Sequence, residues 1–318
     1  MACSITQSPD RARPTDSRSQ KWRVNIVVGA RRIPRALLGG ALLALSCAGC
    51  SGPVHTTAPI SLSNDRSPSW SPVGDSVAFV HVKVDQTDAV ASGIYLVSAL
   101  GGHPRLVLET NARSLSWRSD GHALVFDSAQ GLFTCTAMGD SLKLLLGASA
   151  YFPSWSPSGN YIAYDDVSNV WLLDVPNGTT RTVTDSLGGG RAPSWAPDER
   201  ALVVTSHLPG NYPLQLVILA ADGRVLRRLD DASNEDYAPA WSPSGAHIAW
   251  NRWVRDAAGT FHPQYWVVDT AGTTRLHIAD GEGRISWSPD GSHLVFVGIN
   301  GRLFTSLATG AGARQITF

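Results

Sequence analysis

The fold is decided by a stretch that reads YFPSWSPSGNYIAYDD, residues 151–166. It holds a Trp on a short apolar run, then a Ser-Pro-Ser-Gly turn, then an alternating strand. Five similar stretches begin at Ser67, Arg113, Ala192, Ala238 and Arg284. The six repeated tryptophans are Trp70, Trp117, Trp155, Trp195, Trp241 and Trp287, and they are 47, 38, 40, 46 and 46 residues apart. A period of about 40 to 50 residues with strand patterning indicates a β-propeller with one blade per repeat.

Each repeat contains four short runs in which β-branched and aromatic residues alternate with polar ones. In the repeat that holds Trp155 these runs are 152–156, 161–165, 170–175 and 180–184. Runs of this kind, separated by Gly, Asn or Asp, predict strands, and short turns join strands that pair antiparallel. The sequence therefore predicts an all-β fold, a six-bladed β-propeller of four-stranded antiparallel blades over residues 67–318.

The repeated tryptophans are predicted to be core residues rather than ligand platforms. Small residues, mostly Ser or Ala, flank each Trp, and strand alternation places them on the face opposite the indole. The turn after each Trp usually ends in Gly, whose positive φ returns the chain into the next strand. Glu199 replaces this Gly in the fourth repeat. A different turn geometry is expected there, because a left-handed Glu costs about 1 kcal/mol.

Composition and charge suit a globular β protein. The chain has 318 residues, 43% of them hydrophobic, with 30 Gly and 19 Pro to supply turns. Residues 1–49 hold eight Lys/Arg and two Asp/Glu, which leaves 18 basic and 24 acidic residues in the body of the chain. This mildly acidic body argues against a nucleic-acid binder, which needs a basic face. Cys135, the one cysteine within the repeats, is predicted to be a small buried packing residue without a disulfide.

Residues 1–49 are predicted to be a signal-peptide region. The basic segment 31–35 precedes about 13 small and apolar residues, 36–48, which is the pattern of a secretory signal. The apolar run is shorter than the roughly 20 residues that a transmembrane helix needs. Because this signal begins late, the hypothesis is a start near Val27 or Val28, with residues 1–26 untranslated.

The end of the signal, LSCAGC at 45–50, resembles the lipobox of bacterial lipoproteins. In those proteins small residues precede a Cys that is diacylated and becomes the new N-terminus. Cys50 fits best, Cys47 is the alternative, and an ordinary cleaved signal peptide is a third reading. The resemblance implies that residues 50–66 form a lipid-anchored tether. It also implies a place in the bacterial cell envelope, at the periplasmic face of the outer membrane rather than the inner one.

The repeats resemble the WD40-like repeats of the TolB family of bacterial propellers. The motifs that carry the resemblance include PSWSPSG at 153–159 and SWSPDG at 286–291, each followed by an alternating strand, and the likeness covers residues 67–318. The full TolB protein has an α/β domain before its propeller, whereas about 16 residues separate Cys50 from the first repeat, so TolB's own partners do not carry over. Similar repeats form half of prolyl-oligopeptidase-type enzymes, but the G-x-S-x-G elbow of their hydrolase domain is not found in the sequence.

Candidate binding residues lie where the first strand of each repeat begins and the second ends, because these points meet at the mouth of a propeller's central channel. The first-strand candidates are Arg66, Arg113, Tyr151, Arg191, Tyr237 and Arg284, and the second-strand acids are Asp127 and Asp165. Arg and Tyr are favoured anchors at interfaces, and Arg binds carboxylates through two hydrogen bonds. The alternative is structural, with the arginines simply paired to the acids.

Two long connections in neighbouring repeats, 207–213 and 251–264, are expected to form an aromatic lip at this mouth. Residues 251–264 of the fifth repeat are interpreted as a loop that exposes Trp253, unless its aromatic residues pack on one another. The predicted function is a non-catalytic, lipid-anchored envelope propeller that binds a protein or peptide at the channel mouth. It is expected to be a monomer without cofactor, metal or catalytic residues, and to meet the membrane only through its lipid. The alternative is a propeller lyase or hydrolase that acts on an anionic saccharide.

Overall fold

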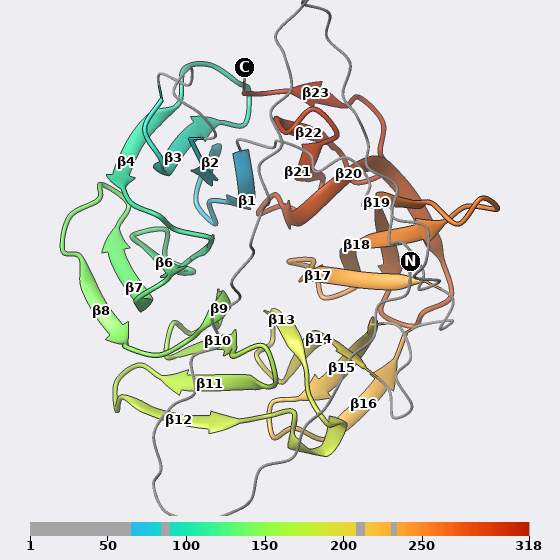
Figure 1. Cartoon of the computed structure of the whole chain (residues 1–318), viewed down its shortest axis with the longest axis horizontal. Coiled ribbons are helices and arrows are strands. Elements are labelled where there is room, and N and C mark those ends of the chain that lie inside the picture. The colour runs from blue at the N-terminus through green and yellow to red at the C-terminus, as the bar shows by residue number, and fades with distance from the viewer. Residues whose placement is uncertain (1–64, 84–89, 208–213, 230–233, 318) are drawn as a thin grey trace, which may run out of the picture. The chain divides into compact units, whose positions relative to one another are not determined.

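Antiparallel β-sheets make up most of the protein in the computed structural model (Figure 1). The structure describes residues 65–83, 90–207, 214–229 and 234–317, all within the unit His55–Phe318. The predicted signal region, Cys47, Cys50, most of the predicted tether and residues 208–213 of the predicted lip lie outside these residues. No helix in the described ranges is long and apolar enough to cross a membrane.

Four sheets have four strands each, in chain order. The first two contain β1 (Asp65–Trp70), β2 (Ser76–His81), β3 (Gly93–Ser98), β4 (Arg105–Glu109), and β5 (Ser114–Trp117), β6 (Ala123–Ser128), β7 (Gly131–Thr136), β8 (Lys143–Leu146). The next two contain β9 (Tyr151–Trp155), β10 (Tyr161–Asp165), β11 (Val170–Asp174), β12 (Thr179–Thr182), and β13 (Arg191–Trp195), β14 (Ala201–His207), β15 (Leu214–Ala220), β16 (Val225–Arg228). A 3-10 turn, η1 (Asp185–Leu187), precedes β13. The four-strand pattern predicted for these repeats is confirmed, and β1 starts two residues before the predicted boundary.

The last two repeats share one seven-stranded sheet. It contains β17 (Glu235–Trp241), β18 (His247–Arg255), β19 (Phe261–Asp269), β20 (Arg275–Trp287), β21 (His293–Gly298), β22 (Leu303–Leu307) and β23 (Arg314–Gln315). Residues 275–280 of β20 pair with β19, and residues 281–287 pair with β21. The sequence predicted two separate strands here. They are continuous because Gly283, at a φ of 106°, lets the backbone change partner without a loop.

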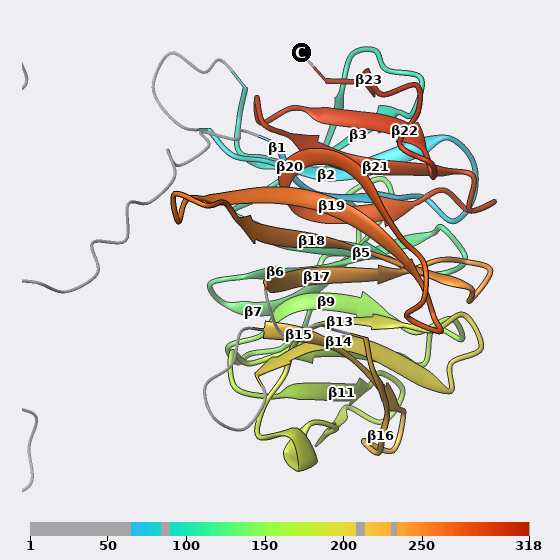
Figure 2. The ribbon, with the colours of Figure 1, turned by 90° about the vertical axis from the view of Figure 1, so that its right-hand side faces the viewer.

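The first strands of the repeats form a closed ring around the centre (Figure 1). In ring order β1 contacts β5, β5 contacts β9, and the series continues through β13, β17 and β20 back to β1. The later strands of each sheet lie progressively farther out, and the side view shows the sheets fanned around the ring (Figure 2). The side chains between successive sheets form the hydrophobic clusters of the core.

The core role predicted for the six repeated tryptophans is confirmed for four that are buried, while Trp70 and Trp241 are half-buried and pack against core clusters. Trp117, Trp155, Trp195 and Trp287 are 7–8% exposed. The indole N–H groups of Trp117, Trp195 and Trp287 donate to backbone carbonyls in the first strand of the preceding repeat at 3.0–3.2 Å. These three tryptophans therefore fix the spacing of consecutive repeats as well as filling the space between them. Cys135 is also buried, and burial raises the pKa of its thiol to about 11.

The first and last repeats meet in the same way as consecutive ones. The backbone N–H of Trp155 donates to Ser116 Oγ of the preceding sheet, and the N–H of Trp70 donates to Ser286 Oγ at 3.0 Å. Ile316, which is fully buried, packs in a cluster with residues of both β2–β3 and β21–β22. These contacts close the ring between β1 and β20–β23.

The turn at Glu199 corrects an expectation from the sequence. Glu199 has a φ of 60° and closes the same turn as the glycines, with its N–H donating to Ala196 O at 3.0 Å. The predicted change of geometry was wrong because the side chain compensates the strain. Its carboxylate accepts hydrogen bonds from Ser158 N at 3.0 Å and Ser158 Oγ at 2.7 Å, in the neighbouring sheet.

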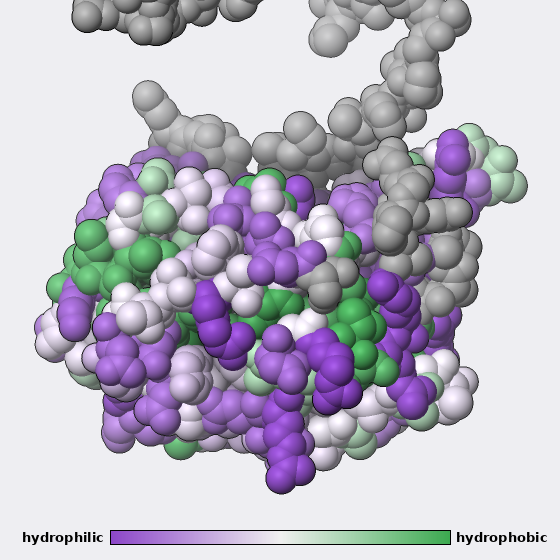
Figure 3. All heavy atoms as spheres, turned by 90° about the horizontal axis from the view of Figure 1, so that it is seen from below, coloured by the Kyte–Doolittle hydropathy of each residue, from purple (hydrophilic) through white to green (hydrophobic). Residues whose placement is uncertain are grey.

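The outer side of the ring is mostly hydrophilic, with hydrophobic areas between the polar ones (Figure 3). Outer strands expose single leucines, such as Leu144 on β8 and Leu226 on β16. Isolated apolar side chains of this kind are normal on a soluble surface. The buried charged side chains lie instead at the mouth of the ring, the end at which the first strands begin.

Candidate partner-binding site at the channel mouth

The first strands of four repeats bulge where they begin. Ser67, Phe152, Ala192 and Ala238 each precede a Pro and adopt φ values of 46–50°. At each of these points the pairing with the second strand shifts register. A β-bulge bends the strand and redirects the side chains beside it. The strained residues therefore set the orientation of the neighbouring Arg and Tyr candidates at the mouth.

Among the predicted mouth residues, Arg113 contacts both a buried acid and an aromatic ring. Its Nε lies 3.0 Å from Asp127 Oδ2, and its Cζ lies 4.4 Å from the centre of the Tyr151 ring on the next sheet. The Arg113 side chain is 43% exposed, whereas Asp127 is 1% exposed. The predicted structural alternative therefore holds for this pair. Arg113 Nη2 also donates to Ser128 O, while the side chain as a whole stays exposed. The contact with Tyr151 and these two polar contacts fix the plane of the guanidinium.

Arg284 lies in the centre of the ring. Its Cζ is 5.6 Å from the ring of Phe152, which belongs to a sheet that is not adjacent to its own. Its Nη1 is buried and has no hydrogen-bond partner among the described residues. Burial lowers the pKa of Arg284 to about 10, and the negative charges of Asp127 and Asp165 counteract part of this lowering. The structure thus brings Arg284 together with both predicted acids.

The carboxylates of Asp127 and Asp165 mainly accept hydrogen bonds from backbone N–H groups. Asp127 Oδ1 accepts from Ser114 N at 2.9 Å, and Asp165 Oδ2 accepts from Ala192 N at 2.8 Å. Burial raises the pKa of the Asp127 carboxyl, and it raises that of Asp165 to about 6. The backbone hydrogen bonds and the nearby arginines oppose these shifts. Both acids therefore position the start of a first strand and balance the arginine charge.

The raised pKa of Asp165 predicts a pH-dependent stability. An unfolded Asp titrates near pH 4 and the folded one near pH 6, so the native state holds the extra proton between these values. This stabilising contribution is complete below pH 4 and is lost as the pH rises through 6, by up to about 3 kcal/mol. Urea unfolding at pH 4, 5, 6 and 7 should show a steeper loss for the wild type than for Asp165→Asn. Parallel pH curves for the two proteins would contradict the assignment.

The remaining predicted residues lie around the group formed by Arg113, Arg284, Asp127 and Asp165, but not all of them contact it. Arg66 is exposed on β1, and Arg191 is exposed on β13, with its Nε donating to Val167 O at 2.9 Å. Tyr237 packs against Trp253, with ring centres 6.0 Å apart. Burial raises the pKa of Tyr237, with Glu235 adding to the shift.

The predicted loop 251–264 is instead an extension of a hairpin. β18 and β19 stay paired as far as Arg255 and Phe261, so the hairpin reaches beyond the neighbouring strands (Figure 2). Trp253 is half-buried between Tyr237 and Phe261, at ring distances of 6.0 and 6.2 Å. The alternation of the sequence continues through this segment, which makes pairing more favourable than an open loop. The aromatic residues therefore pack on one another, as the predicted alternative has it.

A buried ion pair and a buried Asp–His contact at the mouth were missed from the sequence. Asp236 binds Arg252 through two hydrogen bonds of 2.7 and 2.9 Å, and Asp65 lies 2.9 Å from His81 Nδ1. Both acids stand five residues before a repeated Trp, and both basic residues stand eleven after it. Aligning the repeats on their tryptophans would have revealed this shared pattern. The described residues contain no group of three or more His, Cys, Asp or Glu placed to hold a metal ion.

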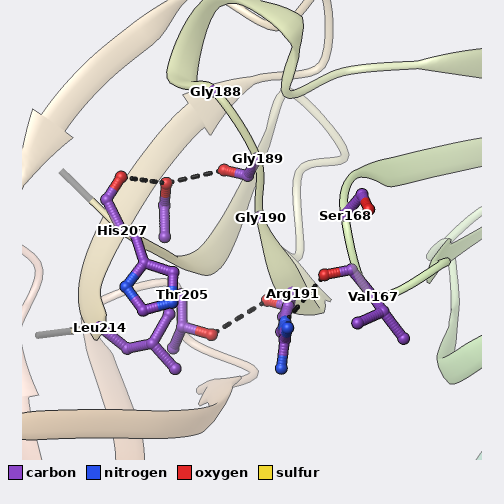
Figure 4. A pocket seen from close by; sticks show the side chains of 10 residues that line it. Val167, Ser168, Gly188, Gly189, Gly190, Arg191, Thr205, His207 and Leu214 are labelled. Carbon is purple, nitrogen blue, oxygen red and sulfur yellow. Dashed lines mark hydrogen bonds between the residues drawn. The ribbon is translucent and has the colours of Figure 1, made fainter. Parts of the chain in front are cut away.

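A small pocket lies beside the mouth, where the β9–β12 sheet meets the β13–β16 sheet. Its volume is about 200 Å3, and its lining residues are Val167, Ser168, Gly188, Gly189, Gly190, Arg191, Thr205, Ser206, His207 and Leu214. Figure 4 shows His207 and Leu214 on one side and Val167 and Ser168 on the other, with the glycines and Arg191 between them. Arg191 thus belongs to both the mouth and this pocket.

Comparison with known proteins agrees with this architecture. An uncharacterized protein of Agrobacterium fabrum is 24% identical over 269 residues, which cover 81% of this chain and 78% of the relative. A putative TolB from Agrobacterium tumefaciens has a TM-score of 0.58 at 21% identity, and covers 71% of this chain and 87% of its own. TolB from Acinetobacter baumannii has a TM-score of 0.63 at 17% identity over 74% of this chain, and the chain spans 62% of that protein.

An enzyme shares the fold as well. An oligogalacturonate lyase, solved in complex with manganese, has a TM-score of 0.54 at 11% identity, and the likeness covers 80% of this chain and 77% of the lyase. At such identities the structural likeness establishes the fold alone. The model of the TolB β-propeller domain family matches residues 141–316, more than half of the sequence. The chain belongs to the TolB β-propeller domain family.

Proposed function

We propose that this protein is a non-catalytic envelope propeller that binds a protein or peptide partner at the mouth of its ring. The observation that carries the proposal is Arg113, which is stacked on Tyr151, paired with a buried acid and still 43% exposed. An arginine held in this way loses little conformational entropy on binding, and its Nη1 makes no hydrogen bond within the described residues. The exposed Arg66 and Arg191 extend the basic character around the rim.

The buried acids favour binding over catalysis. Asp127 and Asp165 are 1% and 2% exposed, and their oxygens accept backbone hydrogen bonds from Ser114, Val167 and Ala192. A general acid or base must come within hydrogen-bond reach of its substrate. Acids that are this enclosed act instead as supports for the arginines.

A binding experiment tests the mouth. The tagged full chain is used to capture partners from envelope extracts, and the bound proteins are quantified. Arg113→Ala is expected to weaken retention of a specific partner at least tenfold, which corresponds to about 1.4 kcal/mol or more for an interface anchor. Arg224→Ala is the matched control, because Arg224 is exposed in the turn between β15 and β16, at the other end of the strands. Equal retention by Arg113→Ala, with an unchanged unfolding temperature, would count against the mouth.

We also propose that the mature chain is anchored by lipid on Cys50, as a monomer at the periplasmic face of the outer membrane. β1 begins at the mouth, so a tether of the 15 residues 50–64 would leave from that face. A flexible chain of this length spans roughly 20 Å on average, which would keep the mouth close to the membrane and to membrane-bound partners. Labelled palmitate should enter the wild type and Cys47→Ser but not Cys50→Ser. Labelling lost in Cys47→Ser alone would move the anchor to Cys47.

The ring is inferred to have six blades, with the seven-stranded sheet counted as two that share β20. The contacts that run from β1 through β5, β9, β13 and β17 to β20 support this count. An experimental structure with another number of repeats around the axis would reject it.

The second candidate is a lyase or hydrolase that acts on an anionic saccharide. It is favoured by two acids with raised pKa values beside Arg284, and by the shared fold of an oligogalacturonate lyase. Turnover of a uronic-acid oligosaccharide that is abolished by Asp165→Asn would establish this reading over the binding one.

A further inference from the structure

We propose that the pocket between the β9–β12 and β13–β16 sheets binds a carboxylate at the end of a short aliphatic group. The ligand would be either a small organic acid or the C-terminal residue of a polypeptide, which share this chemistry. Arg191 is a cationic group of the lining, whose described residues include no Asp or Glu. The carboxylate of Asp165 interacts electrostatically with Arg191 but is buried and does not line the pocket. A pocket with an arginine and without a carboxylate wall favours an anion over a cation.

Arg191 is oriented for this task. Its Nε donates to Val167 O at 2.9 Å, which fixes the plane of the guanidinium against the neighbouring sheet. Its two terminal nitrogens make no hydrogen bond within the described residues, and the side chain is exposed. Two parallel N–H donors of this kind match the two oxygens of a carboxylate. The backbone carbonyl of Arg191 also accepts from Thr205 Oγ1 at 3.3 Å, which ties this residue to β14.

Glycines shape the floor of the pocket. A Cβ on Gly189 would lie 2.6 Å from the backbone oxygen of Ser168, so a larger residue there would displace backbone. A Cβ on Gly190 would lie 2.8 Å from Thr184 Cγ2, so that side chain would have to shift. Gly189 also has a φ of 129°, which favours glycine. Ser206 Oγ donates to Gly189 O at 2.7 Å and holds the segment in place. The Gly189 N–H makes no hydrogen bond within the described ranges and is a second donor for an anion.

The apolar walls of the pocket determine which group can be attached to the carboxylate. Leu214 and Val167 lie on opposite sides of the pocket and are apolar (Figure 4). The volume of about 200 Å3 is suited to one small acid or one aliphatic residue rather than to a folded surface. Backbone and arginine capture of a chain-terminal carboxylate is a known mode of peptide recognition. The polypeptide form of this proposal rests on the proposed function, because the pocket borders the mouth; the small-acid form does not.

Calorimetric titration of the full chain tests the proposal with three probes: N-acetyl-leucine, N-acetyl-leucine amide, and a hexapeptide that ends in Leu with a free carboxylate. At least one of the two free acids is expected to bind. N-acetyl-leucine is expected to bind with a millimolar Kd, and N-acetyl-leucine amide at least tenfold more weakly. Arg191→Gln should weaken binding of the free acids at least tenfold. Arg224→Gln, which makes the same charge change at the other end of the strands, should not. A hexapeptide that binds at least tenfold more tightly than N-acetyl-leucine identifies a C-terminus as the ligand, and equal affinities identify a small acid.

The proposal is overturned if neither free acid binds, if the acid and the amide bind equally, or if Arg191→Gln binds like the wild type. These outcomes are separable from failure of the mouth. A protein that retains its envelope partner through Arg113 but binds no free acid would reject the pocket alone. A protein that binds the free acids without an Arg113-dependent partner would reject only the proposed function.

Discussion

Replacement of Asp236 by alanine is expected to lower the free energy of unfolding by about 3–5 kcal/mol. Asp236 is fully buried and binds Arg252 through two hydrogen bonds, and the Arg252 side chain is 5% exposed. Asp236 Oδ1 also accepts from Trp250 Nε1 at 2.7 Å. Removing the acid takes two charge-assisted hydrogen bonds from the buried Arg252 guanidinium and the acceptor from the buried Trp250 indole, and both losses carry a desolvation penalty.

Urea unfolding at neutral pH measures this effect, and two further variants interpret it. Asp120→Ala breaks an ion pair with Arg118 whose side chains are 43% and 38% exposed, so its cost should stay below about 1 kcal/mol. Asp236→Leu/Arg252→Met removes both charges together and should recover most of the stability lost in Asp236→Ala. A double variant as unstable as the single one would show that the cost comes from packing rather than from an unpaired charge.

Replacement of Ile316 by alanine is expected to cost about 2–5 kcal/mol and to loosen the ring at its closure. Ile316 is fully buried among side chains of β2, β3, β21 and β22, so its removal leaves a cavity between the first and last repeats. The hydrogen bond from Thr317 Oγ1 to Asp65 Oδ2, at 2.5 Å, lies beside the same junction. Opening should therefore begin here rather than between other sheets.

Hydrogen exchange together with urea unfolding checks this second prediction. Ile299→Ala is the matched control, since Ile299 is 77% exposed and its truncation should change stability by no more than about 0.5 kcal/mol. In Ile316→Ala, amides of β1 and β22 should lose protection before those of β10 and β11. An even loss of protection across all sheets would argue against a ring that opens at one junction.

The repeated motif was sufficient to predict the architecture. A Trp followed by a tight turn and an alternating strand is a local feature that recurs six times, and the turn ends in Gly in five of the six repeats. An irregularity in one repeat is therefore outweighed by the others. The same locality explains where prediction failed. Glu199 keeps the common turn only because Ser158 of another sheet binds its carboxylate, and no local rule contains that contact.

The candidate site was predicted in part. Position within the repeat placed Arg113, Asp127, Asp165 and Arg284 at one end of the strands, and the structure brings these four together. The sequence did not indicate that Arg284 reaches Phe152 in a sheet that is not adjacent to its own, because that contact depends on the diameter of the ring. The sequence also did not show that Trp253 packs on Tyr237, whereas the mouth arginines are exposed.

By itself, the sequence determined the strand-forming unit, its sixfold recurrence and the end of each unit at which charged side chains gather. These follow from patterns shorter than one repeat, where side-chain periodicity and turn chemistry act directly. Only the tertiary structure decided which acid each arginine meets, which carboxylates are buried enough to have raised pKa values, and that Arg191 borders a glycine-lined pocket. The reason is physical: burial, charge pairing and pocket shape depend on distances between repeats, and those distances exist only once the ring is closed.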